Sequence, residues 1–179
     1  MISSYDKEEY AEEFEKLGID KFICEPVFKS DIVRIMNKGR ERFRFKRINK
    51  NPLKGKKVLI VEDNEINIDI ISDYLDDVDI VHESVRNGLD AYNLIIKDHS
   101  FDCVLMDVRM PVMGGYEATG KIREYDDEYT RTVPIIAMTA NAFAEDVQKS
   151  KSAGMNDHIT KPVDPEIFYD ILKKYIVAD

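Results

Sequence analysis

Four short apolar runs, each closed by polar residues, mark the chain from residue 58 onward. They are 58–63 (VLIVED), 104–107 (VLMD), 134–139 (PIIAMT) and 157–162 (DHITKP). Unbroken apolar runs of strand length are typical of parallel strands that are buried on both faces. Polar residues at the carboxyl ends of such strands gather at one edge of the sheet, where ligands bind. The pattern predicts that five polar residues meet there. These are Glu62, Asp63, Asp107, Thr139 and Lys161.

Apolar residues at helical spacing separate these runs. In the first such stretch they are Ile66, Ile70, Ile71 and Tyr74. Strands are predicted at 57–61, 79–83, 101–106, 133–138 and 157–160. Helices are predicted at 64–75, 87–97, 115–125, 143–153 and 165–176, with 126–128 as a polar loop. In the second helix we expect Leu89, Tyr92, Leu94 and Ile95 to face inward, at least in part. Five strand–helix units of this size imply an α/β fold, a doubly wound five-stranded parallel sheet with helices on both faces.

Length and composition fit one such domain with additional material. The chain has 179 residues, of which 44% are hydrophobic. No apolar run approaches the roughly 18 residues of a membrane helix, and no signal-peptide pattern opens the chain. Cys24 and Cys103 both fall in apparent strands, so buried packing is expected for them rather than a disulfide framework. The composition predicts a cytoplasmic segment that makes no membrane contact.

Charge is distributed unevenly along the chain. Residues 58–179 carry 11 basic and 25 acidic side chains, and this acidic part should repel nucleic acid. Residues 37–57 carry 10 basic side chains and 1 acidic side chain. We expect a solvated basic linker over 37–55. Contact of this stretch with the acidic domain or with another anionic surface is an alternative.

The five polar residues suit phosphoryl chemistry. A carboxylate oxygen can attack phosphorus, but clustered carboxylates repel each other and the incoming dianion. A Mg²⁺ ion bound by these carboxylates would remove that repulsion. A lysine ammonium and a threonine hydroxyl can donate to phosphate oxygens. Taken singly, the acidic pair Glu62-Asp63 is also explained as a helix N-terminus, where the helix dipole favours acidic residues. Asp107 taken singly is also explained as a turn residue. Their joint order, together with Pro111, Gly114-Gly115 and the Lys161-Pro162 step, favours one site.

This combination resembles the receiver domain of two-component response regulators over residues 56–178, and so implies a flavodoxin-like receiver fold. The resemblance implies that Asp107 accepts a phosphoryl group from a histidine kinase or a histidine phosphotransfer protein. Mg²⁺ would be held by Glu62, Asp63, Asp107 and the backbone carbonyl of Arg109. Thr139 and Lys161 would contact the phosphate. His158 stands three residues before Lys161, where receivers place an aromatic ring that changes rotamer on phosphorylation, so His158 and Thr139 are candidate switch residues. A partly exposed strand residue without such a role is the alternative for His158.

An ungapped repeat links the first 36 residues to the end of the chain. Five pairs stand 136 positions apart: Ser3 and Thr139, Gly18 and Gly154, Ile23 and Ile159, Pro26 and Pro162, Val27 and Val163. We interpret 1–36 as the trailing part of a second, degenerate receiver, followed by the linker and by a receiver domain over 56–179. Glu25 stands there at the lysine position and Ser3 at the threonine position, so the usual phosphate contacts would be lost.

Two receivers in tandem are similar to the tail of a hybrid sensor histidine kinase. Asp63-Asn64 followed by Asn67, and the run from Gly154 to Pro162, are typical of receivers from such kinases. The chain shows no kinase catalytic segment, and none of His82, His99 and His158 lies in a recognisable phosphoacceptor helix. A receiver of this kind would catalyse only its own phosphorylation and dephosphorylation. Because a helix bearing Tyr10, Phe14 and Leu17 needs a covering surface, self-association is also considered.

Three classes of function fit the sequence. The first is a phosphoacceptor receiver of a phosphorelay, which switches partner binding or passes the group to a histidine phosphotransfer partner. The second is a pseudo-receiver that binds partners without phosphorylation, against which the intact five-residue site counts. The third is an aspartate-nucleophile hydrolase. Such hydrolases usually need an acid/base carboxylate two residues after the nucleophile, where this chain has Arg109.

Overall fold

The structure, a computed structural model, describes residues 2–3, 23–24, 51–140 and 144–177. The chain divides into two compact units, Met1–Lys50 and Asn51–Asp179. In the second unit the strands are β3 (Lys57–Val61), β4 (Val81–Val85), β5 (Cys103–Asp107), β6 (Ile135–Thr139) and β7 (Asp157–Thr160). They form one parallel sheet in the order β4-β3-β5-β6-β7.

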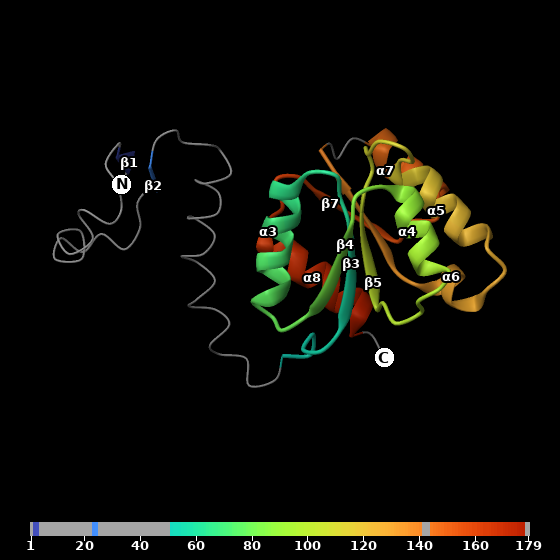
Figure 1. Ribbon diagram of the computed structural model, residues 1–179, viewed down its shortest axis with the longest axis horizontal. Coiled ribbons are helices and arrows are strands. Elements are labelled where there is room, and N and C mark those ends of the chain that lie inside the picture. The colour runs from blue at the N-terminus through green and yellow to red at the C-terminus, as the bar shows by residue number, and fades with distance from the viewer. Residues whose placement is uncertain (1, 4–22, 25–50, 141–143, 178–179) are drawn as a thin grey trace. The chain divides into compact units, whose positions relative to one another are not determined.

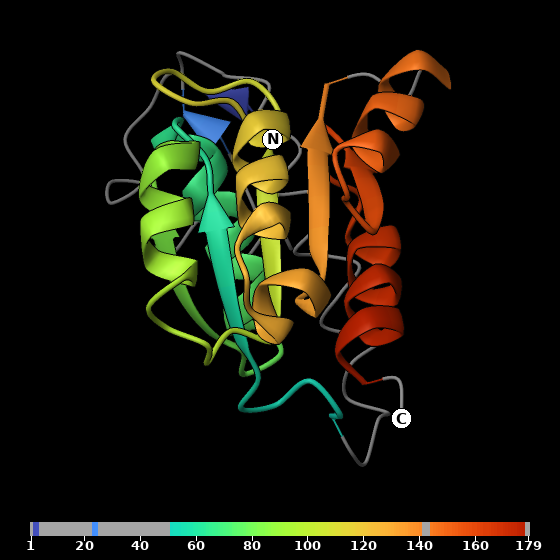
Figure 2. The same ribbon diagram turned by 90° about the vertical axis from the view of Figure 1, so that its right-hand side faces the viewer.

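Helices cover both faces of this sheet. They are α3 (Glu65–Asp76), α4 (Gly88–Ile95), α5 (Gly115–Glu124), α6 (Glu128–Thr132), α7 (Ala144–Ser152) and α8 (Pro165–Ile176). α3 and α8 lie on one face, and α4, α5 and α7 on the other (Figure 1). Figure 2 shows α4 and α5 in front of strands that all run in the same direction. The predicted doubly wound parallel fold is confirmed.

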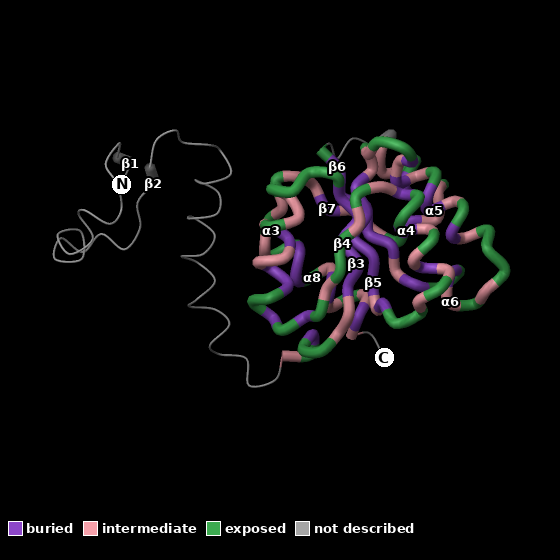
Figure 3. The backbone as a smooth tube through the Cα atoms, in the orientation of Figure 1, coloured by how far each residue is buried: buried purple, intermediate pink, exposed green. Residues whose placement is uncertain are grey.

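Burial follows from the position of each strand in the sheet. Every residue of β5 and β6 is buried, and so are the last four residues of β3 (Figure 3). The edge strand β4 is mostly exposed, and Val81 keeps 55% of its surface accessible. On the face of the sheet that α3 and α8 cover, Tyr74 of α3 packs against Phe168 and Tyr169 of α8. Cys103 is a free thiol buried in β5, as predicted.

Several local predictions were wrong. The strands expected at 101–106 and 133–138 begin two residues later, at Cys103 and Ile135. The second strand begins at Val81, two residues later than predicted, because Asp79 adopts a left-handed φ of 55° that ends the preceding turn. The polar segment after α5 contains a short helix, α6, whose N-terminus is capped by the Asp127 carboxylate accepting from Tyr129 N and Thr130 N. Leu89, expected to face inward, lies on the solvent side of α4 and is 39% exposed.

The compact unit also includes residues that were expected in the linker. Leu53 is buried, and the Asn51 side chain donates to the Val78 carbonyl. The backbone N–H of Gly55 donates to the Asp79 carbonyl at 2.8 Å. Residues 51–55 therefore pack against the domain ahead of β3.

In the first unit the structure describes two short parallel strands, β1 (Ile2–Ser3) and β2 (Ile23–Cys24). Their register pairs Ile2 with Ile23 and Ser3 with Cys24. The same register recurs 136 positions later, where β6 pairs Met138 with Ile159 and Thr139 with Thr160. The predicted helix with Tyr10, Phe14 and Leu17 and the basic stretch up to Lys50 lie outside the described residues.

Across the described ranges, no helix has both the length and the apolar character that crossing a bilayer requires.

An ionic network at the amino end of the sheet provides a test of acid stability. The Lys57 ammonium lies 2.8 Å from Glu83, 3.0 Å from Asp98 and 2.9 Å from Ser100. Hydrogen bonds from Ser100 and from Lys57 lower the pKa of Asp98 from 3.8 to about 2. Because the folded pKa is depressed, the stability that Asp98 contributes is present above about pH 4 and is lost as the pH falls towards 2.

We expect Asp98→Asn to be less stable than the wild type at neutral pH and equally stable near pH 2. Urea unfolding followed by circular dichroism from pH 2 to pH 7 measures the difference. A difference that does not change with pH would contradict the role of this carboxylate.

Candidate active site

The carboxyl edge of the sheet brings together the polar residues that the sequence singled out. Asp107 is the last residue of β5 and Thr139 the last of β6, and each is 8% exposed. Glu62 directly follows β3 and is buried, whereas Asp63 is exposed. Lys161 directly follows β7, and its backbone N–H donates to the Thr139 carbonyl at 2.7 Å. Asp107 is paired with Met138 and Thr139 with Thr160, so the carboxyl ends of β5, β6 and β7 lie next to one another at one edge of the sheet.

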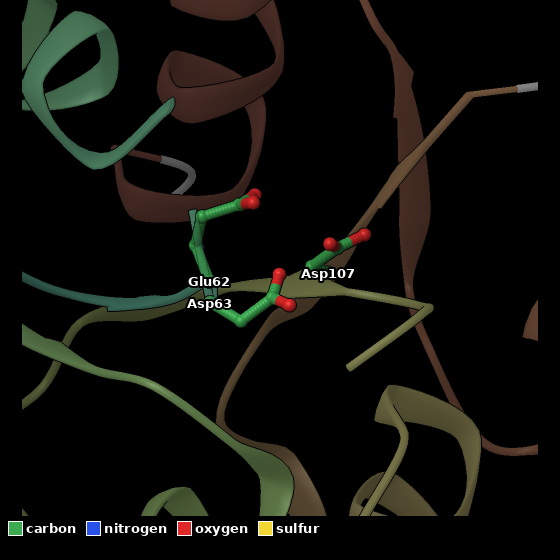
Figure 4. Close-up of side chains that lie close together, drawn as sticks. All are labelled: Glu62, Asp63 and Asp107. Atoms are coloured by element: carbon green, nitrogen blue, oxygen red, sulfur yellow. The ribbon is translucent and has the colours of Figure 1, made fainter. Parts of the chain in front are cut away.

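Three carboxylates form the centre of this site. Glu62, Asp63 and Asp107 each offer an oxygen, and these oxygens all lie within 4.8 Å of one another. Figure 4 shows the three side chains next to one another, with the Asp63 carboxylate extending towards Asp107. Hard divalent cations prefer carboxylate oxygens, so this donor set fits a magnesium-sized ion. No nitrogen or sulfur ligand belongs to the group.

Lys161 links two of these carboxylates. Its ammonium lies 2.5 Å from Glu62 Oε2 and 3.1 Å from Asp107 Oδ2. Glu62 is only 1% exposed, and a carboxylate so deeply buried requires charged or hydrogen-bonding partners. The site is therefore an acidic cluster that already contains one internal cation.

The contacts of Arg109 and His158, the other predicted site residues, do not test the roles predicted for them. The backbone N–H of Arg109 lies 3.4 Å from Asp107 Oδ1, and the role of the Arg109 carbonyl in metal binding stays a prediction. The His158 side chain is half-buried on β7, and its Nδ1 lies 3.8 Å from Asp157 Oδ1. Its switch role, like that of Thr139, also stays a prediction.

The sequence-based site lacked one residue that the structure adds. Asn67 lies in the first turn of α3 and donates from Nδ2 to Glu62 Oε1 at 2.9 Å. It was noted only as part of a sequence signature. Because α3 begins immediately after β3, with Asn64 as its N-cap, the third helical residue is brought back over the strand end. In the sequence, the three-residue spacing between the N-cap Asn64 and Asn67 was the signal that could have identified this residue.

A glycine holds the acceptor strand close to the following helix. The backbone N–H of Gly115 donates to the Val108 carbonyl at 3.1 Å. A Cβ atom at Gly115 would lie 2.2 Å from the backbone oxygen of Asp107, well inside any real contact. Only glycine fits this approach without moving Asp107 or α5.

We therefore expect Gly115→Ala to destabilise the domain by about 1–3 kcal/mol, the typical range for an overpacked core site with a displaced backbone. Gly120→Ala is the matched control in the same helix. A Cβ there meets nothing within 4 Å, so the change should stabilise by about 0.5–1 kcal/mol. Thermal unfolding of both variants measures the contrast, and equal midpoints would contradict the predicted clash.

The fold and the site together define the class of protein. A model of the response regulator receiver domain matches residues 58–173, and the chain belongs to this family. Hybrid signal transduction histidine kinase L of Dictyostelium discoideum is 43% identical over 122 residues, covering 66% of this chain and 7% of that protein. The chain thus spans only a small part of the length of this curated relative. The predicted receiver and its similarity to hybrid histidine kinases are confirmed.

Two solved structures show the same fold. The receiver domain of a sensor histidine kinase from Pseudomonas aeruginosa PAO1 was crystallised with a magnesium ion coordinated in its active-site cleft. It matches with a TM-score of 0.64 and 38% identity, covering 69% of this chain and 99% of that one. The receiver domain of Ssk1 from Saccharomyces cerevisiae was crystallised with the histidine phosphotransfer protein Ypd1. It matches with a TM-score of 0.64 and 29% identity, covering 70% of this chain and 91% of that one.

Proposed function

We propose that Asp107 accepts a phosphoryl group from a phosphohistidine of a histidine kinase or a histidine phosphotransfer protein. The observation that carries this proposal is the arrangement at the end of β5. There a nearly buried aspartate has two further carboxylates within 4.8 Å and a lysine ammonium at 3.1 Å. In the reaction an Asp107 oxygen bonds to phosphorus while the bond from phosphorus to the imidazole nitrogen breaks, and the freed imidazole takes up a proton.

In this proposal Asp63 and Asp107, together with Glu62, hold Mg²⁺. Bound there, the ion offsets the negative charge of the carboxylates and of the transferred group. The donor set and the magnesium-containing Pseudomonas receiver support this assignment. Lys161 supplies a positive charge beside the attacking oxygen, and Thr139 supplies a hydroxyl at the end of the next strand. The proposed location is cytoplasmic, where phosphorelay donors act.

Incubation with acetyl phosphate and Mg²⁺ tests this function against the other two classes. Intact-protein mass spectrometry should show a gain of one phosphoryl group that depends on Mg²⁺. A pseudo-receiver would show no gain. A hydrolase would keep turning over small phosphate esters. Such turnover is disfavoured here because the exposed Arg109 stands where these hydrolases have an acid/base carboxylate.

The rim of the site offers an apolar surface for the phosphotransfer partner. Ile66 at the start of α3, Val112 in the loop after β5 and Ile167 at the start of α8 are 56%, 78% and 53% exposed. All three follow the carboxyl end of a strand, so they lie at the same end of the sheet as Asp107. Val112 also has a φ of 67°, an unusual conformation for a β-branched residue. The Ssk1 receiver in its complex with Ypd1 supports a partner of this kind.

We expect the double variant Ile66→Ser, Ile167→Ser to slow transfer from a phosphorylated histidine phosphotransfer protein by about thirtyfold or more, because two interface anchors that contribute over 1 kcal/mol each are lost. Uptake from acetyl phosphate should be unchanged, because that small donor needs no docking surface. Val81→Ser, at a 55% exposed residue on the amino end of β4, is the control. Equal slowing with both donors would contradict the docking role.

We also propose that residues 1–36 are the trailing part of a degenerate receiver, joined through the linker to the receiver domain as in a hybrid histidine kinase. The 136-residue repeat and the matching register of β1–β2 and β6–β7 support this organisation. Oxidation of Ser3→Cys should yield a disulfide with Cys24, the residue with which Ser3 is paired in the β1–β2 register. Absence of that disulfide under conditions that oxidise both thiols would argue against the repeat.

A further inference from the structure

Glu62 is the most deeply buried charge of the site, and its partners come from two directions. Lys161 reaches Oε2 from the end of β7 at 2.5 Å. Asn67 reaches Oε1 from the first turn of α3 at 2.9 Å. The backbone N–H of Asn64 lies at 3.4 Å from the same oxygen, a long and weak contact. Each carboxylate oxygen therefore has one strong donor, and for Oε1 that donor is Asn67.

This division of donors fixes the orientation of the carboxylate. With Oε1 bound to the Asn67 amide, Oε2 is directed at the Lys161 ammonium. That ammonium is also 3.1 Å from Asp107 Oδ2, so the contacts run from Asn67 through Glu62 and Lys161 to the acceptor. Asn67 lies on a capped helix, which holds its amide in place more firmly than a loop would.

We infer that Asn67 is a positioning residue for phosphoryl transfer: it fixes Glu62 against Lys161 and so holds the Lys161 ammonium beside Asp107. The inference rests on the proposed function and adds a residue to it. Among the described residues, no hydrogen bond joins Asn67 to Asp63 or to Asp107, so its effect on Mg²⁺ binding is indirect.

Loss of the amide leaves Oε1 with only the long backbone contact. A buried carboxylate that lacks a donor turns towards whatever cation or donor remains, and the fixed geometry of Lys161 is lost. The rate of phosphorylation should then fall by more than the affinity for Mg²⁺, because Asp63 and Asp107, two of the three carboxylates proposed to hold the ion, keep their positions.

Three variants test whether Asn67 acts on the rate of phosphorylation more than on Mg²⁺ binding. Asn67→Leu keeps the approximate size of the side chain and removes the donor, Asn67→Gln restores a donor, and Asn93→Leu on the exposed side of α4 is the control. Acetyl phosphate uptake is measured at saturating Mg²⁺, with the Mg²⁺ dissociation constant obtained by isothermal titration calorimetry. For Asn67→Leu we expect uptake at least about fivefold slower, as loss of a hydrogen bond to a charged group allows, and a Mg²⁺ dissociation constant within about threefold of the wild type. Asn67→Gln should recover most of the rate.

Wild-type uptake by Asn67→Leu, an equal fall in rate and Mg²⁺ affinity, or failure of Asn67→Gln to recover the rate would each overturn the inference. A second readout does not need phosphorylation. The ¹⁵N NMR signal of the Lys161 ammonium, slowed in exchange by its two ion pairs, should broaden in Asn67→Leu and remain sharp in Asn93→Leu. An unchanged signal would overturn the inference. Absence of uptake in the wild type, with the expected NMR change, would overturn the proposed function alone.

Discussion

Asp107→Asn is expected to abolish phosphoryl uptake and to leave the fold intact. The amide has nearly the same shape as the carboxylate but lacks the nucleophilic oxygen, so uptake should fall below about 1% of the wild-type level. The residue is 8% exposed and lies at the end of a fully buried strand, so its replacement leaves the core unchanged. Lys161 loses one partner but keeps Glu62 at 2.5 Å.

Mass spectrometry after incubation with acetyl phosphate and Mg²⁺ measures the effect, and circular dichroism verifies the fold. Asp170→Asn, on the exposed side of α8, is the matched control and should take up phosphate normally. Uptake at the wild-type level in Asp107→Asn would show that another residue is the acceptor.

Lys161→Met is expected to separate metal binding from phosphoryl transfer. The ammonium lies 2.5 Å from Glu62 and 3.1 Å from Asp107, so it occupies the acidic cluster as a competing cation. Two unit charges about 4 Å apart interact by about 4 kcal/mol at an effective dielectric constant of about 20. Because side chains and solvent relax around the change, we expect only part of this, an increase in Mg²⁺ affinity of about tenfold.

Phosphorylation of the same variant should fall by about a hundredfold or more, because no other basic side chain in the described part of the chain forms an ion pair with Asp107 and could replace Lys161 beside the transferred group. Calorimetry with Mg²⁺ and uptake of acetyl phosphate give the two measurements. Asp63→Ala is the contrasting variant, in which a carboxylate of the cluster is lost and both metal binding and phosphorylation should decrease. Weaker Mg²⁺ binding in Lys161→Met would contradict the role of Lys161 as an internal counter-ion.

Much of the fold was accessible from the sequence because the central strands are buried on both faces. A strand such as β3 reads as an unbroken apolar run, and its predicted bounds, 57–61, match the structure. β7 and α8 were also predicted with the observed bounds, since Asp164 with Pro165 marks a helix start clearly. β4 was displaced by two residues because an edge strand carries little hydrophobic pattern. β5 and β6 also begin two residues later than predicted, because Phe101 and Val133 are buried apolar residues that extend the apolar pattern beyond the paired strand.

The sequence by itself determined the parallel α/β architecture and the order in which the polar residues leave the strands. That order was enough to predict which side chains would meet, because the carboxyl ends of parallel strands share one edge. Only the tertiary structure decided how they meet. The pairing of Lys161 with both Glu62 and Asp107, and the fixing of Glu62 by Asn67, depend on distances across three strands and one helix. The exposure of Ile66 was likewise decided by tertiary packing, since apolar spacing marks a helix but not which of its apolar residues remain uncovered.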